Sequence, residues 1–318
     1  MTPPIETVPV GKTTLRVPRL GVGTAPMANM YSPLSDAQAT EMIQWALENG
    51  MNFFDTAPLY GAGLAERRLG LALKDVPRDA FVLQTKIGRL VREDGTIHFD
   101  FSRDGVLRSI DESLQRLQLD RIDSILVHDP DGPREPEQFK QVLDETFPTL
   151  AELRSQGVIH SLGAGMNQWQ MEWDFARNFP VDCFLLAGRY TLLEQTSLDF
   201  LAYCQENKIS IFLGGVYNSG ILATGPGPGA RYNYREAPPE IMDKARRIQE
   251  ICERHGVSLR TAAMHFAAAH PAVSSLVLGS VSKDEAADNR HTWAAEIPGA
   301  LWHELRAADL IDPGAPLP

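Results

Sequence analysis

Four side chains capable of acid–base chemistry accompany apolar segments of strand length. Asp55, Lys86 and His128 each stand at or near the end of such a segment, and Tyr60 follows the first one. A phenol has a pKa near 10, so Tyr60 needs help to exchange a proton near neutrality. We expect a cationic Lys86 to lower the pKa of Tyr60 by about two units, worth roughly 2.7 kcal/mol, while Asp55 keeps that lysine charged and oriented.

His128 would complete this set by donating a hydrogen bond to a substrate oxygen and polarising it. The four groups suit proton transfer to a carbonyl oxygen, or from a hydroxyl, while a hydride moves elsewhere. No side chain supplies a hydride, so a cofactor must take part. The set therefore predicts an oxidoreductase site.

Eight short apolar segments can position these groups. Each has apolar residues at both odd and even positions, which is typical of a strand buried on both faces of a parallel sheet. The predicted strands occupy residues 19–27, 53–57, 81–88, 122–128, 161–166, 181–188, 210–216 and 274–280.

Amphipathic segments of helical period separate these strands. The first has Ser35 or Asp36 as its N-cap and Gly50 just beyond its end. The segment 103–117 shows a clear i, i+3, i+4 apolar stripe. The predicted helices occupy residues 36–49, 103–117, 136–155, 168–177, 197–207, 239–255, 258–269 and 283–293.

Eight strands alternating with helices over about 260 residues predict a closed (β/α)8 TIM barrel. The segment 7–17 is expected to form a short N-terminal hairpin that closes the bottom of the barrel. An open doubly wound sheet is the alternative, but GVGTAPM after the first strand lacks the third glycine of GxGxxG. Catalytic groups of a barrel lie at the carboxyl ends of its strands, where all four side chains would meet.

Composition narrows the function further. The 318 residues carry 30 Lys and Arg against 41 Asp and Glu, for a formal charge of −11, which argues against binding nucleic acid or an anionic membrane. No apolar run approaches a membrane span, and the N-terminal residues lack the apolar core of a signal peptide. We expect a cytoplasmic protein whose residues 1–318 form one domain, because no Ser/Gly linker divides them.

Other chemistries lack their motifs. The three cysteines are widely spaced without a CxxC pair, and are expected to be buried and reduced. The eight histidines form neither HxH nor HExxH, so no metal site is expected. The nucleophile elbow GxSxG of serine hydrolases is also absent.

Several segments together carry a resemblance to a known family. FFDTAPLYGAGLAERRLGLAL, VLQTKIG, SILVHD and GSVSKDEAADN resemble the aldo-keto reductase superfamily between about residues 19 and 289. LLAGRYTLLEQ, GGVYNSGILATG and ARYNYREAP resemble its branch of NAD(P)-dependent aldose 1-dehydrogenases, which includes L-fucose and D-threo-aldose dehydrogenases and a pyridoxal 4-dehydrogenase. The resemblance implies a catalytic tetrad of Asp55, Tyr60, Lys86 and His128.

The resemblance also implies a nicotinamide cofactor. The family's Ser-Asn pair after strand five is Met166-Asn167 here, so the amide is kept and the hydroxyl is lost. Ala187 replaces a glutamine, and Gly214 replaces the aromatic residue that often stacks on nicotinamide. The implied cofactor-binding residues are Gly23, Thr24, Asp55, Asn167, Gly215, Val216, Asn218, Gly220, Leu222, Gly279, Ser280, Val281, Glu285, Asp288 and Asn289.

The choice between NAD and NADP depends on the loop after strand eight. Gly279 and Glu285 stand where family members that prefer NADP place a lysine and an arginine against the 2′-phosphate. Glu285 would repel that phosphate and could instead accept a hydrogen bond from a free ribose hydroxyl. We therefore expect NAD to be preferred, with NADP possible because Lys283 lies nearby.

Loops after strands one, four, five and seven are expected to line the substrate pocket. The loop 224–239 is long and rich in Gly and Pro, as many lids are. The expected substrate contacts are Met27, Tyr31, Tyr60, His128, Trp169, Arg231 and Tyr232. Their aromatic faces suit a pyranose and a pyridine ring equally.

Four functions remain open at this point. The first is oxidation of C1 of an aldose hemiacetal to a lactone, and the alternatives are the equivalent oxidation of pyridoxal to 4-pyridoxolactone and a general aldehyde or ketone reduction. The fourth is a cofactor-binding regulatory subunit, but the complete tetrad argues against it. We expect a small-molecule substrate and a monomer or small homo-oligomer.

Overall fold

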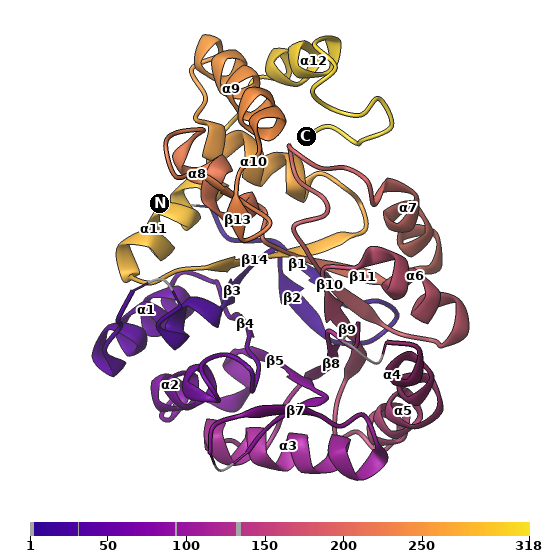
Figure 1. Ribbon diagram of the computed structural model, residues 1–318. Coiled ribbons are helices and arrows are strands. Elements are labelled where there is room, and N and C mark those ends of the chain that lie inside the picture. The colour runs from indigo at the N-terminus through magenta and orange to yellow at the C-terminus, as the bar shows by residue number, and fades with distance from the viewer. Residues whose placement is uncertain (1–2, 31, 93, 132–134) are drawn as a thin grey trace.

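Eight parallel strands form a closed barrel in this computed structural model, which describes residues 3–30, 32–92, 94–131 and 135–318. Neighbouring strands are hydrogen-bonded in chain order around the barrel (Figure 1). The barrel strands are β3 (Leu20–Gly23), β4 (Phe53–Asp55), β5 (Val82–Ile87), β8 (Ser124–His128), β9 (Ser161–Met166), β10 (Cys183–Ala187), β11 (Ser210–Gly214) and β14 (Val273–Gly279). The predicted (β/α)8 architecture is confirmed.

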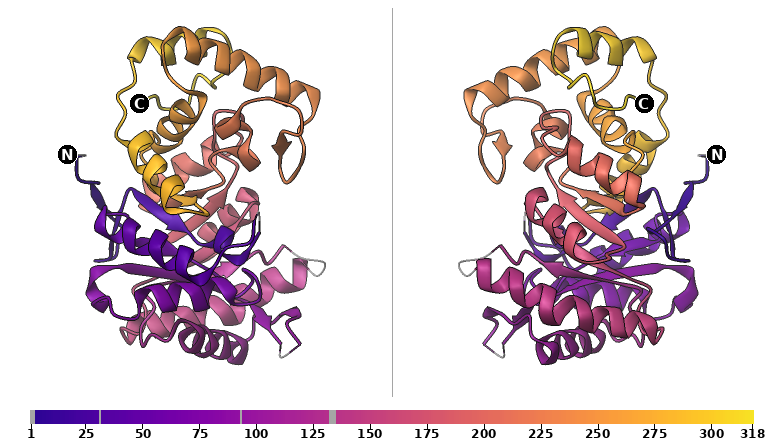
Figure 2. Two further views of the ribbon diagram at one scale, coloured as in Figure 1. Left: turned by 90° about the vertical axis from the view of Figure 1, so that its left-hand side faces the viewer. Right: turned by 90° about the vertical axis from the view of Figure 1, so that its right-hand side faces the viewer.

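The predicted N-terminal hairpin is also present. Strands β1 (Thr7–Pro9) and β2 (Arg16–Pro18) pair antiparallel, with Val8 opposite Val17. At its turn the backbone N–H of Gly11 donates to the Ser210 hydroxyl at 2.8 Å. Ser210 begins β11, so the hairpin covers the amino ends of the strands. Figure 2 shows the N-terminus on the side of the barrel opposite the small β12–β13 hairpin.

Helices surround the barrel, as Figure 1 shows. Serine caps begin several of them: Ser35 forms a complete capping box, and Ser102, Ser258 and Ser282 each accept a backbone N–H of the first turn. The main helices are α1 (Asp36–Glu48), α2 (Leu64–Leu73), α3 (Arg103–Leu117), α5 (Phe147–Ser155), α6 (Trp169–Asn178), α7 (Leu198–Asn207), α9 (Pro239–Arg254), α10 (Leu259–Ala268), α11 (Lys283–Trp293) and α12 (Gly299–Ala307).

Some boundaries differ from the sequence predictions. The first strand ends at Gly23 rather than at residue 27, because Pro26 opens a 3-10 turn over Ala25–Ala28. The helix predicted over 136–155 is divided into α4 (Glu135–Gln141), a π-helical turn (Val142–Thr146) and α5. Helices α2 and α12 had no prediction at all.

Loops at the carboxyl ends of the strands carry further unpredicted elements. The hairpin of β6 (Arg89–Val91) and β7 (Ile97–Phe99) follows β5, with Arg89 opposite Phe99. After β11 come a 3-10 turn (Asn218–Gly220), the short helix α8 (Ile221–Thr224) and the hairpin of β12 (Arg231–Tyr232) and β13 (Arg235–Glu236). These segments lack periodic apolar patterns, so the sequence did not reveal them.

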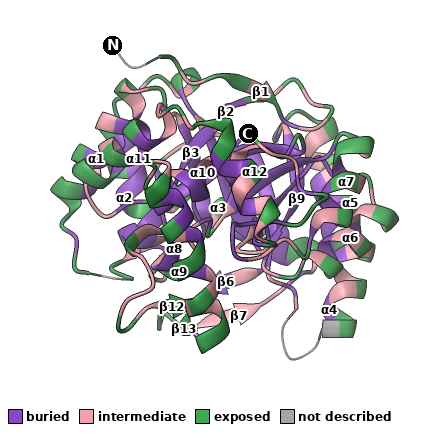
Figure 3. Ribbon diagram, turned by 90° about the horizontal axis from the view of Figure 1, so that it is seen from above, coloured by how far each residue is buried: buried purple, intermediate pink, exposed green. Residues whose placement is uncertain are grey.

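Strand alternation divides the core into two layers. Phe53 and Leu126 point into the barrel and join a small cluster with Phe212, whereas Phe54 and Val127 pack outward against the helices. Figure 3 shows the buried residues concentrated along the central strands. Cys183, Cys204 and Cys252 are buried and free, as predicted. Within the described ranges no helix is long and apolar enough to cross a membrane.

Candidate active site

The alternation of β4, β5 and β8 places three of the four predicted side chains inside the same end of the barrel. Asp55 follows outward-facing Phe54, and Lys86 is the penultimate residue of β5. His128 is the last residue of β8, two positions beyond inward-facing Leu126. Each inward residue at a strand's carboxyl end therefore faces the barrel mouth, where TIM-barrel active sites lie.

Lys86 connects Asp55 with Tyr60. Its Nζ donates to Asp55 Oδ2 at 2.7 Å and Oδ1 at 2.9 Å, to the Thr56 carbonyl at 3.0 Å and to the Tyr60 hydroxyl oxygen at 3.1 Å. These contacts engage all three ammonium protons. Since an ammonium has no lone pair, Tyr60 accepts from Lys86 and keeps its own O–H for another acceptor.

A second row of polar groups, which the sequence analysis did not identify, supports Asp55. The Gln84 amide donates to Asp55 Oδ1 at 2.8 Å, and the Ser124 hydroxyl donates to Gln84 Oε1 at 3.0 Å. Gln84 and Ser124 are buried and lie one alternation below Lys86 and Leu126 on the same inner face. The period of two along β5 could have identified Gln84, because it shares the face of Lys86.

Room for the Lys86 side chain comes from glycine on the neighbouring strand β9. A Cβ at Gly165 would lie 3.3 Å from Lys86 Cε, tighter than ordinary van der Waals contact. A Cβ at Gly163 would come within 1.7 Å of the Cys183 carbonyl oxygen. Gly165 therefore leaves room for the lysine inside the barrel, and Gly163 lets β9 lie close to β10.

The electrostatics of Tyr60 differ from the prediction. Burial raises the pKa of Tyr60 above its ordinary value, and the nearby Lys86 cation lowers it only in part. Burial also opposes the charge on Lys86, but the interactions with Asp55 and Tyr60 together outweigh this effect and leave the pKa of Lys86 raised. The predicted fall in the pKa of Tyr60 is therefore wrong in sign, because the sequence did not reveal how deeply the phenol is enclosed. Tyr60 is a neutral phenol at neutral pH.

His128 lies edge-on to Tyr60, with ring centroids 5.8 Å apart and planes at 87°. Burial lowers the pKa of His128 well below its ordinary value, and the Lys86 and Arg89 cations lower it further. The imidazole is therefore neutral and can donate one N–H. Tyr60 and His128 together offer two hydrogen-bond donors to one oxygen atom, which suits acid–base chemistry at a carbonyl or hydroxyl oxygen.

Two more charged residues lie beside His128 and were not predicted. Asp129 Oδ2 is 3.7 Å from His128 Nε2, and it accepts a hydrogen bond of 2.9 Å from Arg89 Nη2. Burial raises the pKa of Asp129, while Arg89 lowers it in part. The tetrad is thus flanked by a second ion pair.

The predicted cofactor residues lie at the carboxyl ends of β3, β9, β11 and β14. Gly23 pairs with Asp55 and with Gly279, which brings the ends of three strands together. Thr24 is fully buried, and its hydroxyl has no hydrogen-bond partner among the described residues. Asn167 donates to the Ala187 carbonyl at 2.8 Å. An unpartnered buried hydroxyl and an amide anchored between β9 and β10 fit a polar ligand at this edge.

The turn between β11 and α8 gathers the next group of predicted residues. Gly215 and Gly220 have positive φ of 62° and 105°, and a Cβ at Gly220 would meet no atom within 4 Å. The Asn218 side chain joins this turn to the β10 loop by accepting from Thr191 and donating to the Gly188 carbonyl. Val216 and Leu222 are buried in the core, so only their backbone can reach a ligand.

The loop from β14 to α11 holds the remaining predicted cofactor residues. Glu285 Oε2 accepts from the Val281 backbone N–H at 2.9 Å, and Asn289 Nδ2 donates to the Ser280 hydroxyl at 3.1 Å. The exposed Lys283 instead pairs with Glu41 of α1 at 3.2 Å. The cation that could have favoured a phosphate is thereby directed away from Glu285.

Arg260 of α10 was missed by the sequence analysis. It pairs with Asp288 and donates to Asn289 Oδ1 at 2.7 Å, and its guanidinium lies 5.7 Å from the Tyr217 ring centroid. It stands 28 residues before Asp288, and no spacing pattern connects the two. The structure thus adds an arginine beside Asp288 and Asn289, two of the implied cofactor-binding residues.

The predicted substrate residues do not gather as a single group. Met27 is fully buried in the core, and its carbonyl accepts from Arg68, so its side chain lines no open surface here. Trp169 is partly buried against Trp173. Tyr31 lies outside the described residues.

The β12–β13 hairpin is fastened to the β10 loop. Tyr232 donates to Glu194 Oε2, and Arg189 donates to Asn233 Oδ1 at 2.7 Å. Arg231 is exposed and pairs in register with Glu236. These contacts hold the hairpin in place over the β10 loop, and the predicted substrate roles of Arg231 and Tyr232 remain predictions.

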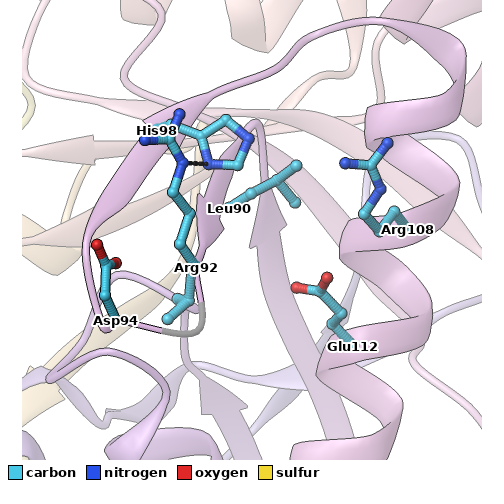
Figure 4. Close-up of a pocket in the computed structure, with 7 residues that line it drawn as sticks. Leu90, Arg92, Asp94, His98, Arg108 and Glu112 are labelled. Carbon is cyan, nitrogen blue, oxygen red and sulfur yellow. Dashed lines mark hydrogen bonds between the residues drawn. The ribbon is translucent and has the colours of Figure 1, made fainter.

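Two cavities lie away from the tetrad. One, of about 520 Å³, lies between the β6–β7 hairpin and α3, and Figure 4 shows Arg92 and His98 facing Arg108 and Glu112 across it. The other, of about 640 Å³, lies beside the Tyr232–Glu194 contact. Neither is lined by a tetrad residue, and no cluster of metal-ligating side chains occurs in the described part of the chain.

Comparison with known proteins agrees with this geometry. The model of the aldo/keto reductase family matches residues 19–309. A D-threo-aldose 1-dehydrogenase of a Pseudomonas species is 38% identical, with 93% of this chain and 95% of that protein aligned. A pyridoxal 4-dehydrogenase of Microbacterium luteolum is 36% identical, with 95% and 97% aligned. The holo structure of aldo-keto reductase AKR11C1 from Bacillus halodurans superposes with a TM-score of 0.80 at 26% identity, covering 99% and 98% of the two chains.

Proposed function

The chain belongs to the aldo/keto reductase family of oxidoreductases, which use nicotinamide cofactors, and from that premise we propose that it oxidises C1 of a cyclic aldose to the lactone with NAD. The contact that carries the proposal is the 3.1 Å hydrogen bond from Lys86 to Tyr60 beside His128. It gives one oxygen atom of the substrate a proton-exchanging partner and a polarising donor. The 38% identical relative named as a D-threo-aldose 1-dehydrogenase supports the choice of aldose.

The reaction requires the C1 hydroxyl of the substrate to lose a proton as a hydride leaves the same carbon. The bound nicotinamide supplies the chemistry of accepting that hydride. Tyr60 takes the proton as its phenolate, which the Lys86 ammonium stabilises. Asp55 holds Lys86 in place, and neutral His128 fixes the position of the substrate oxygen by a hydrogen bond.

The residues present fit NAD better than NADP. The Glu285 carboxylate lies against the Val281 backbone at the start of α11, where a 2′-phosphate would meet like charge. Lys283 is paired with Glu41, and Arg260 is paired with Asp288. No cation at this loop is therefore left to balance a phosphate, within the ranges that the structure covers.

A pyridoxal substrate is the second candidate, and a specific observation favours it. The pyridoxal 4-dehydrogenase relative aligns over 95% of this chain at 36% identity, close to the values for the aldose dehydrogenase. Pyridoxal forms a cyclic hemiacetal, so the same proton transfer through Tyr60 would give a lactone. The two proposed functions therefore share one reaction and differ only in the substrate that the site binds.

The test is a substrate panel. Purified protein with NAD or NADP is assayed for formation of the reduced cofactor with five- and six-carbon aldoses of both series, pyridoxal and simple secondary alcohols. The proposal expects the highest kcat/KM with an aldose and NAD, with the lactone identified by NMR. Preference for pyridoxal would select the second candidate, and activity only with simple alcohols or carbonyls would refute both.

A further inference from the structure

The backbone at Asp129 interrupts the alternation of strand β8. Asp129 has a φ of 39°, in the left-handed region that few residues other than glycine adopt. In a regular strand its side chain would point away from the face that carries His128. The left-handed turn instead brings Asp129 Oδ2 to 3.7 Å from His128 Nε2, while the Asp129 N–H donates to the Gly165 carbonyl at 3.2 Å. Such backbone conformations are found preferentially at functional sites.

Arg89 fixes the position of this carboxylate from the other side. Arg89 Nη2 donates to Asp129 Oδ2 at 2.9 Å, and its guanidinium lies 5.1 Å from the centroid of the Phe99 ring across the β6–β7 hairpin. The Arg89 Nε is buried without a hydrogen-bond partner, and Asp129 Oδ1 accepts no hydrogen bond from the described residues. The Arg89 and Asp129 side chains are 19% and 25% exposed. The pair therefore leaves one carboxylate oxygen, Asp129 Oδ1, free to accept a hydrogen bond at a partly exposed position.

From this arrangement we propose that Asp129, held by Arg89, recognises the hydroxyl group on the carbon next to the one that is oxidised. This inference rests on the proposed oxidation of an aldose. O1 and O2 of an aldose lie about one hydrogen-bond length apart. When O1 meets Tyr60 and His128, O2 can therefore reach a group that adjoins His128, as Asp129 does. A carboxylate accepts from that hydroxyl through Asp129 Oδ1, while Arg89 holds the other carboxylate oxygen in place.

The same pair would discriminate against substrates without this hydroxyl. A 2-deoxy sugar would displace water from Asp129 Oδ1 without offering that oxygen a hydrogen-bond donor. Sites built to bind a hydroxyl can reject the analogue that lacks it by as much as about 10⁴–10⁵-fold when fully buried. Because a quarter of the Asp129 side chain is exposed, we expect a smaller effect: kcat/KM for the aldose should exceed that for its 2-deoxy analogue on the order of 10²-fold.

The test compares an aldose that the enzyme oxidises with its 2-deoxy analogue in wild type and in Asp129→Asn. Asparagine tolerates the left-handed backbone and keeps the shape, but it removes the charged acceptor. The variant should lose most of its kcat/KM for the aldose and keep that for the deoxy sugar. The ratio of the two kcat/KM values should therefore fall to within a few-fold of one. Both sugars depend on the same Tyr60, so any shift of its pKa cancels in the ratio.

Two further variants keep the test decisive. Asp131→Asn removes the same charge two residues away from Asp129, and its ratio should equal that of wild type. Arg89→Met, with folding checked by circular dichroism and thermal melting, should reduce the ratio as Asp129→Asn does. The inference is overturned if folded Asp129→Asn and Arg89→Met keep the ratio of wild type, or if wild type oxidises both sugars equally. Either result leaves the proposed function standing. Failure of the wild type to oxidise any aldose overturns the proposed function and this inference with it.

Discussion

Glu172 of α6 should make the protein less stable as the pH rises, and replacing it should remove that dependence. Its side chain has no exposed surface, and neither carboxyl oxygen has a hydrogen-bond partner among the described residues. Burial raises the pKa of Glu172 well above its ordinary value, the Asp129 carboxylate raises it further, and the Met166 backbone lowers it in part. Glu172 is therefore protonated in the native state at a pH where it ionises in the unfolded chain.

The sign of the effect follows from proton counting. Above the ordinary pKa of a glutamate, near 4.3, the unfolded chain releases this proton while the native state retains it. The native state then binds more protons, so stability falls with rising pH. Each pH unit costs up to about 1.4 kcal/mol while the native group stays protonated, which gives a ceiling of about 2.7 kcal/mol between pH 5 and pH 7.

Glu172→Gln keeps the shape and does not ionise in either state. Its unpaired amide costs roughly 1–3 kcal/mol at every pH, so the informative quantity is the pH dependence of the difference from wild type. Urea unfolding at several pH values between 5 and 8 should show the variant gaining on wild type as pH rises. Glu206→Gln, at an exposed position of α7, is the matched control and should give a constant difference. Parallel stability curves for Glu172→Gln and wild type would refute the reasoning.

Three further predictions concern the active site. Tyr60→Phe should lower kcat by about 10²–10⁴-fold while the affinity for reduced cofactor, measured by fluorescence titration, stays the same; turnover within a few-fold of wild type would remove Tyr60 from the mechanism. Because burial raises the pKa of Tyr60, the rate of oxidation should increase with pH through the alkaline range, and Lys86→Met should move that increase to higher pH and lower the plateau; a flat profile with a deuterium isotope effect at C1 would contradict this. Wild type should favour NAD over NADP by about 5–30-fold in kcat/KM, and Glu285→Arg should reduce or reverse the preference at one fixed ionic strength, whereas a wild-type preference for NADP would point to Arg260.

The barrel and the three tetrad residues at the ends of its strands were predictable from the pattern of the strands, whereas Tyr60 lies in the loop after β4. Apolar residues on both parities indicated strands buried on both faces, and a charged residue at the carboxyl end of such a strand can only face the mouth or the helices. Lys86 and His128 were assigned correctly to the barrel mouth on that ground. The tetrad also combines a carboxylate, a phenol, an ammonium and an imidazole, a set of groups that a network with only a structural role rarely needs.

What the sequence did not reveal lies where periodicity fails. Asp129 breaks the alternation through its left-handed backbone, and nothing in the letters HDPD distinguishes that conformation from a continued strand. Arg89 belongs to a hairpin inside a loop, and its partner is forty residues away. The sign of the shift in the pKa of Tyr60 depends on how completely the phenol is enclosed, which is a property of the folded barrel rather than of Tyr60 and Lys86 alone.

The two ion pairs at the mouth give Tyr60 and His128 different roles. Lys86 is bonded to Tyr60 and stabilises its phenolate, so a proton can leave the phenol and return to it. The same cation, together with Arg89 and burial, opposes protonation of His128, so the imidazole has a pKa well below its ordinary value and stays neutral. An imidazolium at this position would compete with Tyr60 as the proton donor to the substrate oxygen. Asp55 and Asp129 hold the two cations on either side. We therefore propose that the site exchanges protons through the phenol and uses the histidine only to orient the oxygen that reacts.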